Sequence, residues 1–382
     1  MHRTRNLALV LNKARVGNAM SKFKRTLMRR LIFGGAVIGG GTAVLAAGTM
    51  TGAALAYWGV KQVRRFHLSG RTVLITGGSR GLGLALARAF LRRGAKVALL
   101  GREVETLERA RQLLAGKGMV FVRPADVRDP SQVNQAVLDV QQEFGDIDVL
   151  VNNAGTLTVG PMDTMTPKDY QEALNVYFWG PFHLAQAVLP SMRQRKTGRI
   201  VNISSIGGKI SVPHLLPYCT GKFALSGWSE GMRQELTRDN VYVTTVYPGL
   251  MRTGSPRNAE FKGKHRDEYT WFTLSDAMPG LSISADRAAR QIVTACEYGR
   301  AELIVSLPAR IAIKAHALLP SMSSLALRFT NQLLPQAEGA PEQAGKKGSQ
   351  SETAATRSFL TVLDKQAAQR NNQVPNPSPV TT

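Results

Sequence analysis

Cysteine is scarce in this sequence, which excludes several classes of protein at the outset. Cys219 and Cys296 are the two thiols among 382 residues, too few for a disulfide scaffold or an all-cysteine zinc or iron–sulfur site. The six histidines show no metal-ligand spacing, so no metal is expected. Charged residues are also few, at 20%, whereas 43% of the residues are apolar. This balance argues against a disordered chain.

Acidic residues are in the minority, with 26 Asp and Glu against 49 Lys and Arg. Residues 1–30 form a basic arm with nine Lys and Arg and no acid. The rest of the positive charge is spread thinly, without a block of like charges, so no nucleic-acid binding is expected. A basic arm ahead of an apolar stretch indicates a membrane instead.

That apolar stretch covers residues 31–60, which carry no Asp, Glu, Lys or Arg. About 20 apolar residues suffice to cross a bilayer core, and Arg30, Trp58 and Lys61 resemble interfacial anchors. We therefore predict a membrane anchor at 31–60. A cleaved leader, whose apolar core is normally about 7–15 residues, and a buried core helix are the alternatives.

Beyond a linker at 61–70, strand-like and helix-like segments alternate through residues 71–306. This alternation predicts an α/β fold, a doubly wound parallel sheet of the Rossmann-like kind that forms one catalytic domain. The strands are near-continuous apolar runs, as a sheet buried on both faces requires. The expected strands are residues 71–76, 96–100, 119–123, 149–151, 199–203, 241–246 and 301–306.

The segment 307–335 is expected to form two apolar helices, at 309–319 and 322–334. They either pack on their own domain or serve as a membrane contact or lid. Residues 336–382 are rich in Gln, Ala, Ser, Thr, Asn and Pro with few large apolar side chains, which predicts a disordered tail.

The first expected strand runs into a glycine-rich turn with the spacing Gly-x-x-x-Gly-x-Gly, followed by a helix. Glycines let the backbone turn tightly and approach a pyrophosphate, and the free N–H groups at the helix N-terminus favour anions. The turn residues expected to hold a cofactor are Gly77, Ser79, Arg80, Gly81, Leu82 and Gly83.

Three further motifs follow in order, each after an expected strand: Asn-Asn-Ala-Gly at 152–155, Ser205, and Tyr218-x-x-x-Lys222. With the glycine-rich turn, they resemble the short-chain dehydrogenase/reductase family over about residues 70–306. The resemblance implies a nicotinamide cofactor and an oxidoreductase that interconverts carbonyl and alcohol groups of a small molecule.

The resemblance also implies residue roles. Tyr218 would be the general acid/base, and Ser205 would bind the substrate oxygen. Lys222 would hold the nicotinamide ribose and lower the tyrosine pKa, since a free phenol titrates near 10 and a nearby cation stabilises the phenolate. Asn175 would carry a water-linked proton relay to the lysine.

Cofactor contacts carry over from the resemblance in the same way. Asp126 and Val127 would meet the adenine, and Asn152 and Ala154 would line the adenosine side. The loop of Pro248, Gly249 and Thr253 would meet the nicotinamide carboxamide.

The end of the second strand indicates which nicotinamide cofactor is used. An NAD site places an acid there for the ribose 2′-hydroxyl, whereas this chain has Gly101 and Arg102, with Glu103 beyond the strand. Arg102 and Arg80 favour a 2′-phosphate, so NADP is expected and NAD is less favoured.

We therefore expect a membrane-anchored, NADP-dependent oxidoreductase with a lipophilic carbonyl or secondary-alcohol substrate. A 3-oxoacyl thioester reductase is the enzymatic alternative. A catalytically silent nucleotide-binding scaffold is the alternative from another class, against which the intact Ser205, Tyr218 and Lys222 argue. Both flanks of residues 31–60 are basic, so charge does not decide the topology. The need for NADPH favours a catalytic domain facing the cytoplasm, and the resemblance implies a homo-oligomer.

Overall fold

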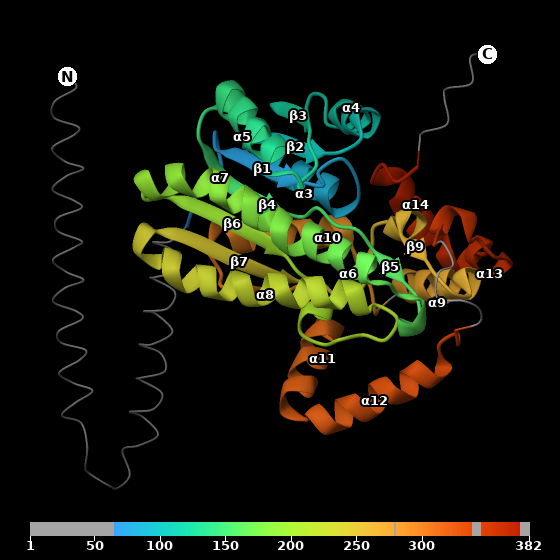
Figure 1. Cartoon of the computed structure of the whole chain (residues 1–382). Helices are drawn as coiled ribbons and strands as arrows, with labels where there is room; N and C mark the ends of the chain where they lie inside the picture. The colour runs from blue at the N-terminus through green and yellow to red at the C-terminus, as the bar shows by residue number, and fades with distance from the viewer. Residues whose placement is uncertain (1–64, 279, 338–344, 375–382) are drawn as a thin grey trace, which may run out of the picture. The chain divides into compact units, whose positions relative to one another are not determined.

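A seven-stranded parallel sheet forms the centre of the computed structural model, which describes residues 65–278, 280–337 and 345–374 (Figure 1). The strand order is β11-β7-β6-β4-β1-β2-β3. Because β1 pairs with β2 on one side and β4 on the other, the winding reverses between β1 and β4. The strands are β1 (Thr72–Thr76), β2 (Lys96–Gly101), β3 (Val120–Pro124), β4 (Ile147–Asn152), β6 (Gly198–Ile203), β7 (Val241–Tyr247) and β11 (Glu302–Ile304).

Helices cover both faces of this sheet, as the alternation of the sequence predicts. On β1, Val73 and Ile75 pack with α3, α4 and α10, whereas Leu74 packs with α5, α7 and α8, and all three side chains are fully buried. The α/β, Rossmann-like fold is thereby confirmed. The covering helices are α3 (Gly81–Leu91), α4 (Val104–Leu113) and α10 (Ala285–Glu297) on one face, and α5 (Pro130–Phe144), α7 (Gly180–Gln194) and α8 (Leu216–Leu236) on the other.

Short elements gather beyond the carboxyl ends of the strands and shape the substrate side. Two small sheets join there, one with the order β12-β9-β5 and one that pairs β10 with β8. Their strands are β5 (Thr158–Val159), β8 (Met251–Arg252), β9 (Glu260–Phe261), β10 (Ile283–Ser284) and β12 (Lys346–Lys347). The helical segments around them are η1 (Met162–Thr164), α6 (Pro167–Leu174), η2 (Asn175–Trp179), η3 (Ile206–Gly208), η5 (Ser255–Asn258) and α9 (His265–Ala277), while η4 (Thr237–Asp239) follows α8.

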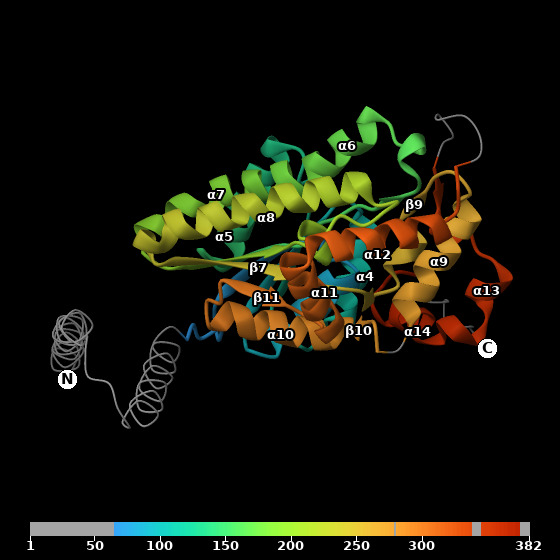
Figure 2. The ribbon, with the colours of Figure 1, turned by 90° about the horizontal axis from the view of Figure 1, so that it is seen from below.

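The two expected C-terminal helices are present as α11 (Leu307–Leu318) and α12 (Pro320–Leu333). They do not pack into the core: Ala309 is buried in α11, and α12 has no buried residue. Figure 2 shows the pair along one side of the domain. The prediction of two helices is confirmed. One of their two predicted roles was packing on the domain, and α12 does not pack in this way because none of its residues is buried.

The predicted disordered tail is corrected by the structure for residues 345–374. This segment contains β12, η6 (Gly348–Gln350), α13 (Ala354–Arg357), η7 (Phe359–Thr361) and α14 (Val362–Arg370). Its buried side chains are mostly polar, namely Ser351, Thr356, Thr361, Asp364, Asn371 and Asn372, together with Ala368. Composition misses such a segment because hydrogen bonds, rather than an apolar face, hold it to the domain.

No helix among residues 65–278, 280–337 and 345–374 is long and apolar enough to cross a membrane. The predicted anchor at 31–60, the basic arm at 1–30 and residues 61–64 of the linker lie outside the described residues.

Replacing Gly83 by alanine tests the packing that forms the glycine-rich turn. A Cβ at Gly83 would lie 2.1 Å from the carbonyl oxygen of Gly77, and a backbone atom cannot move aside cheaply. Overpacking typically costs about 1–3 kcal/mol, so we expect Gly83→Ala to lower Tm by about 2–6 °C in a domain of this size.

Gly227→Ala is the matched control, because Gly227 also lies in a helix but a Cβ there meets nothing within 4 Å. Alanine is the better helix former by about 1 kcal/mol, so this variant should keep or raise Tm. Equal melting temperatures for the two variants in thermal scans would contradict the packing argument.

Candidate active site

A cavity of about 580 Å³ opens at the carboxyl ends of the central strands, where ligands bind in open α/β sheets. Residues that follow five different strands line it: Gly77, Arg102, Ala154, Ser205 and Pro248. The reversal of winding between β1 and β4 separates the helices there and leaves this space.

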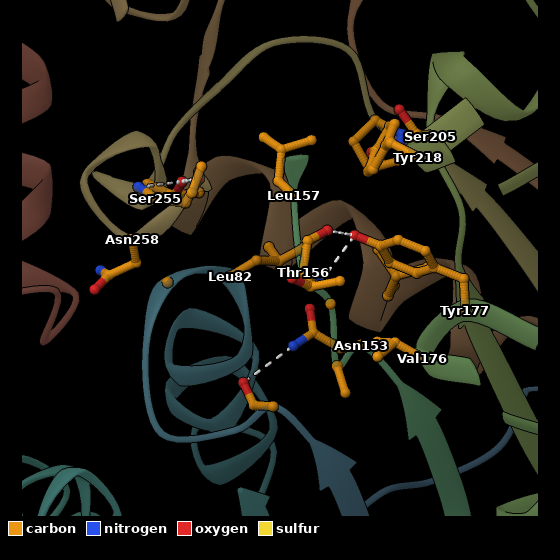
Figure 3. A pocket seen from close by; sticks show the side chains of 18 of the residues that line it. Leu82, Asn153, Thr156, Leu157, Val176, Tyr177, Ser205, Tyr218, Ser255 and Asn258 are labelled. Atoms are coloured by element: carbon orange, nitrogen blue, oxygen red, sulfur yellow. Dashed lines mark hydrogen bonds between the residues drawn. The ribbon is translucent and has the colours of Figure 1, made fainter. Parts of the chain in front are cut away.

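The glycine-rich turn after β1 forms one wall of the cavity. Gly77 and Gly81 have φ angles of +62° and +60°, which side chains other than glycine rarely adopt. The Asn153 amide donates to the carbonyl oxygens of Thr76 at 3.0 Å and Gly77 at 3.1 Å, and the Thr76 hydroxyl accepts the N–H groups of Asn153 and Ala154. The end of β4 therefore holds the turn in shape (Figure 3).

The residues of this wall fit a dinucleotide. The turn leads directly into the N-terminus of α3, whose first N–H groups have no partner within the helix and favour an anion. Gly83 lies so close to Gly77 that a side chain on Gly83 would collide with the Gly77 carbonyl oxygen. A pyrophosphate would lie against Gly81 and Leu82, which both line the cavity.

Asp126 and Val127 lie at the far end of the cavity, after β3. Burial opposes ionisation of Asp126, but hydrogen bonds from Arg128 lower its pKa. Arg128 also binds Glu172 at 2.7 Å. The carboxylate is thus held ionised and oriented by Arg128.

Three of the four predicted catalytic residues gather at the opposite end of the cavity: Ser205, Tyr218 and Lys222. Ser205 follows β6 and accepts the N–H of Gly207 at 3.0 Å, and its side chain lies beside that of Tyr218 from α8 (Figure 3). Lys222, one turn further along α8, donates to the carbonyl oxygen of Ile203 at 2.7 Å. Its ammonium lies 5.7 Å from the centre of the Tyr218 ring.

Burial shifts both titratable groups of this cluster toward their neutral forms. It raises the pKa of the Tyr218 hydroxyl and lowers the pKa of Lys222 to about 7. A protonated Tyr218 is the form that can donate a proton to a carbonyl oxygen. A charged Lys222 acts in the other direction, because it stabilises the phenolate left behind.

Tyr177 is the residue of this cluster that the sequence analysis missed. Its ring lies 3.9 Å from the Lys222 ammonium and meets the Tyr218 ring edge-on at 5.4 Å. Its hydroxyl bonds to the backbone of Thr156, as Figure 3 shows. A Cβ at Gly221 of α8 would come within 2.9 Å of the Tyr177 ring, so glycine there makes room for the ring.

Asn175, to which the resemblance assigns a water-linked proton relay to Lys222, begins the π-helical segment η2. Its side chain accepts a hydrogen bond from Gln171 at 2.8 Å, and it is not among the residues that line the cavity. Residues 175–179 form a π-helical turn between α6 and α7, which rotates the chain out of α-helical register. Tyr177, which lies within this turn, contacts the lysine through its ring.

Two other predicted cofactor residues also lie outside the cavity. Asn152 is the last residue of β4, and its amide donates to Asn202 inside the sheet, whereas its neighbour Asn153 lines the cavity. Gly83 packs against Gly77 behind the turn. The remaining predicted residues do line it: Gly77, Ser79, Arg80, Gly81, Leu82, Arg102, Asp126, Val127, Ala154, Ser205, Tyr218, Lys222, Pro248, Gly249 and Thr253.

Arg80, Arg102 and Glu103 line the cavity where the glycine-rich turn meets the end of β2. Arg80 lies 3.6 Å from the Glu103 carboxylate, and a hydrogen bond from Thr106 lowers the pKa of Glu103. Arg102 is exposed. Two cations and one acid leave this corner with a net positive charge.

The substrate end combines apolar walls with a few polar groups. Leu157, Val212, Leu215, Trp271 and Phe272 supply the apolar surface. Polar groups come from Ser255, Asn258, Ser275 and Asp276.

Comparison with known proteins agrees with this site. The family described as short chain dehydrogenase matches residues 71–262. The chain is 38% identical over 199 residues to dehydrogenase/reductase SDR family member 7B of Mus musculus, across 50% of this chain and 61% of that one. It is 38% identical over 185 residues to ketoacyl reductase HetN of Nostoc sp., across 48% of this chain and 64% of that one. The match thus spans less than two thirds of either relative.

A solved structure has the same architecture. The L-sorbose reductase from Gluconobacter frateurii, complexed with NADPH and L-sorbose, aligns with a TM-score of 0.57 and 27% identity, over 63% of this chain and 97% of that one. The chain therefore belongs to the short-chain dehydrogenase family of oxidoreductases, which act on alcohol and carbonyl groups.

The contact between Tyr177 and Lys222 is expected to set the pH dependence of the site. A cation–π contact contributes about 0.5–2 kcal/mol, roughly 0.4–1.5 pKa units at 1.36 kcal/mol per unit. Removing the ring in Tyr177→Leu should lower the Lys222 pKa further below about 7. Because the charged lysine is the active form, the alkaline limb of kcat/KM for the nucleotide should move to lower pH.

Tyr177→Phe keeps the ring and removes the hydroxyl, so it separates the two contacts of this residue. Its alkaline limb should stay at the wild-type position. A limb that moves equally in both variants would assign the effect to the hydroxyl, and an unmoved limb in Tyr177→Leu would refute the role of the ring.

Proposed function

We propose that this protein is an NADPH-dependent reductase of a lipophilic carbonyl compound, acting at a membrane. The observation that carries the proposal is the cluster of Ser205, Tyr218 and Lys222 at one end of a cavity whose other end is the glycine-rich turn. That arrangement gives one binding groove with a proton donor at the far end of a dinucleotide.

The bound nicotinamide cofactor supplies the hydride that reaches the carbonyl carbon. Ser205 orients the substrate oxygen by a hydrogen bond, and Tyr218 donates its proton to that oxygen as negative charge develops there. Lys222 then stabilises the phenolate on Tyr218. Burial keeps Tyr218 protonated beforehand, since its pKa is raised, and this suits the reductive direction.

NADP is proposed over NAD because of the corner formed by Arg80, Arg102 and Gly101. Guanidinium groups give charge-assisted hydrogen bonds to a 2′-phosphate, whereas Gly101 offers no carboxylate to a 2′-hydroxyl. The solved L-sorbose reductase, with the same architecture, carries NADPH.

A lipophilic substrate suits the apolar wall formed by Leu157, Val212, Leu215, Trp271 and Phe272. A 3-oxoacyl thioester is the second candidate, supported by the similarity to a ketoacyl reductase. A silent scaffold is disfavoured because it has no use for a serine, a tyrosine and a lysine gathered at one end of the cavity. Assembly into a homo-oligomer stays a prediction.

We also propose that α11 and α12 contact an anionic lipid surface. Met322, Leu325 and Phe329 follow one another at helical spacing, and each is more than 60% exposed. Arg310, Lys314 and Arg328 belong to the same pair of helices, which contains no Asp or Glu. Apolar side chains beside cations are typical of helices that lie in the membrane interface.

This surface is compatible with the proposed anchor at 31–60 and with a catalytic domain that faces the cytoplasm. The surface and the anchor would hold the site beside the lipid phase from which a lipophilic substrate comes. The cytoplasm would supply NADPH.

The cofactor assignment is tested by the ratio of kcat/KM for NADPH over NADH. The wild type should prefer NADPH, and Arg80→Ala and Arg102→Ala should each lose about ten- to a hundredfold of that preference, because a hydrogen bond to a charged group contributes about 1.5–3 kcal/mol. Gly101→Asp should favour NADH, and a Cβ at Gly101 meets no atom closer than 3.4 Å. A wild-type preference for NADH would overturn the choice.

Tyr218→Phe serves as the control for the chemistry. It should bind NADPH like the wild type and lose turnover by about 10²–10⁴-fold, the usual contribution of general acid–base catalysis. Retention of more than about a tenth of turnover would remove Tyr218 from its proposed role.

The lipid contact is tested on residues 65–382, which contain the whole sheet but lack the proposed anchor. Met322→Ser and Phe329→Ser together should abolish sedimentation with vesicles of phosphatidylcholine and phosphatidylserine. The matched control is Leu138→Ser, which removes an exposed apolar side chain, 52% exposed, from α5. Equal sedimentation of all three proteins would exclude α12 as the contact.

A further inference from the structure

Residues 345–374, which we name the C-terminal strap, extend from β9 to the glycine-rich turn. The strap begins with β12, which pairs with β9 on the substrate side. It continues through α13 and α14, which pack beside α9 (Figure 1). It ends at the glycine-rich turn, so one segment reaches from the substrate end of the cavity to the cofactor end.

The strap is held midway by contacts with the loop after β7. The Asp364 carboxylate accepts the N–H of Gly254 at 3.1 Å. Gly254 has a φ angle of +76°, and a Cβ there would lie 2.4 Å from Ala368. Thr253, the neighbour of Gly254, lines the cavity, so the strap packs directly behind the cofactor groove.

Asn372 joins two walls of the cofactor groove to each other. Its amide nitrogen donates to the carbonyl oxygens of Ser79 at 2.8 Å and Thr106 at 3.0 Å. Its amide oxygen accepts the Arg109 side chain at 3.2 Å. Ser79 belongs to the glycine-rich turn and Thr106 to the first turn of α4, the two elements on either side of the Arg80 and Arg102 corner.

Asn371 adds a second connection to the same turn. Its carbonyl oxygen accepts the N–H of Gly81 at 2.9 Å, and its side chain accepts Arg88 of α3 at 2.6 Å. Asn371 and Asn372 are 2% and 4% exposed. The side chains of these two buried amides bond to the glycine-rich turn and to the helices α3 and α4 that adjoin it. Such satisfied buried polar groups indicate a specific contact.

Gln373 reaches across the groove. Its amide oxygen accepts the Asn258 side chain at 2.6 Å, and its amide nitrogen lies 3.0 Å from where a Cβ at Gly81 would stand. Gln373 lines the cavity. It therefore bridges the substrate loop on one side and the N-terminus of α3, where a pyrophosphate would lie, on the other.

We propose that the C-terminal strap is a wall of the cofactor site, in which Asn372 is a positioning residue for the glycine-rich turn and Gln373 closes the groove over the bound dinucleotide. The strap then slows release of the nucleotide, because Gln373 has to leave Asn258 before the pyrophosphate can move out. This inference rests on the nucleotide-binding part of the proposed function and is independent of the choice between NADP and NAD.

The first experiment measures dissociation rates on the full chain. NADPH and NADH are each displaced from the protein in a stopped-flow instrument, with nucleotide fluorescence as the signal. Asn372→Ala should speed the release of both nucleotides about tenfold, as expected for the loss of one or two hydrogen bonds. Gln373→Ala should speed it by a smaller factor.

Gln369→Ala is the matched control, since Gln369 is exposed on the strap helix α14. It should release both nucleotides at the wild-type rate. Gln373 is half-buried at the end of the strap, so Gln373→Ala decides the question if Asn372→Ala does not fold. Wild-type release rates in Gln373→Ala and in a folded Asn372→Ala would overturn the proposal.

Hydrogen exchange supplies a readout that needs no turnover. Coupling between two sites is reciprocal, so saturating nucleotide should slow amide exchange in residues 364–374 of the wild type, and less so in Asn372→Ala. Equal rates of amide exchange in the strap with and without bound nucleotide would refute the coupling. A weaker affinity of the wild type for NADPH than for NADH would count against the cofactor choice alone, whereas binding of neither nucleotide would overturn both.

Discussion

The close approach of the glycine-rich turn to itself and to the end of β4 is the constraint on which the rest of the site depends. Gly83 packs so near to Gly77 that no side chain fits between them, and Asn153 ties the turn to β4 through two carbonyl oxygens. This packing directs the N-terminus of α3 into the cavity. It also leaves the Ser79 carbonyl oxygen and the Gly81 N–H free to bond to Asn372 and Asn371 of the C-terminal strap.

Burial governs the chemistry at the other end of the cavity. Lys222 is buried and Tyr218 is half-buried, and the loss of contact with water favours the neutral form of each. Tyr177 counteracts part of that effect for the lysine, because its ring offers the ammonium a π face at 3.9 Å. The fold thereby keeps a proton on Tyr218. It also keeps an ammonium on Lys222, which can stabilise the phenolate that forms when Tyr218 gives up its proton.

Polar contacts between remote segments connect these two ends. Asn372 and Ser79 are 293 positions apart in the chain, and Asp364 meets Gly254 across 110. A segment of low apolar content can dock this tightly because each buried amide or carboxylate finds a partner, which offsets the cost of removing it from water.

Local patterns in the sequence predicted the parallel sheet and the glycine-rich turn. They also predicted that Ser205, Tyr218 and Lys222 meet in one site. Strands in a parallel sheet point the same way, so motifs that follow them meet at one edge and their meeting can be read from sequence. Sequence reasoning could not tell which side chain of two close positions faces the cavity. At Asn152 and Asn153 the strand end decides it, and Asn175 and Tyr177 share a π turn from which Tyr177, and not Asn175, lines the cavity.

Residues 345–374 of the tail were misread for a related reason. Their interpretation as disordered counted apolar side chains, whereas these residues are held by hydrogen bonds to turns and helix ends far away in the chain. The strength of a hydrogen bond depends on the distance and direction of its partner, and those exist only once the domain has folded.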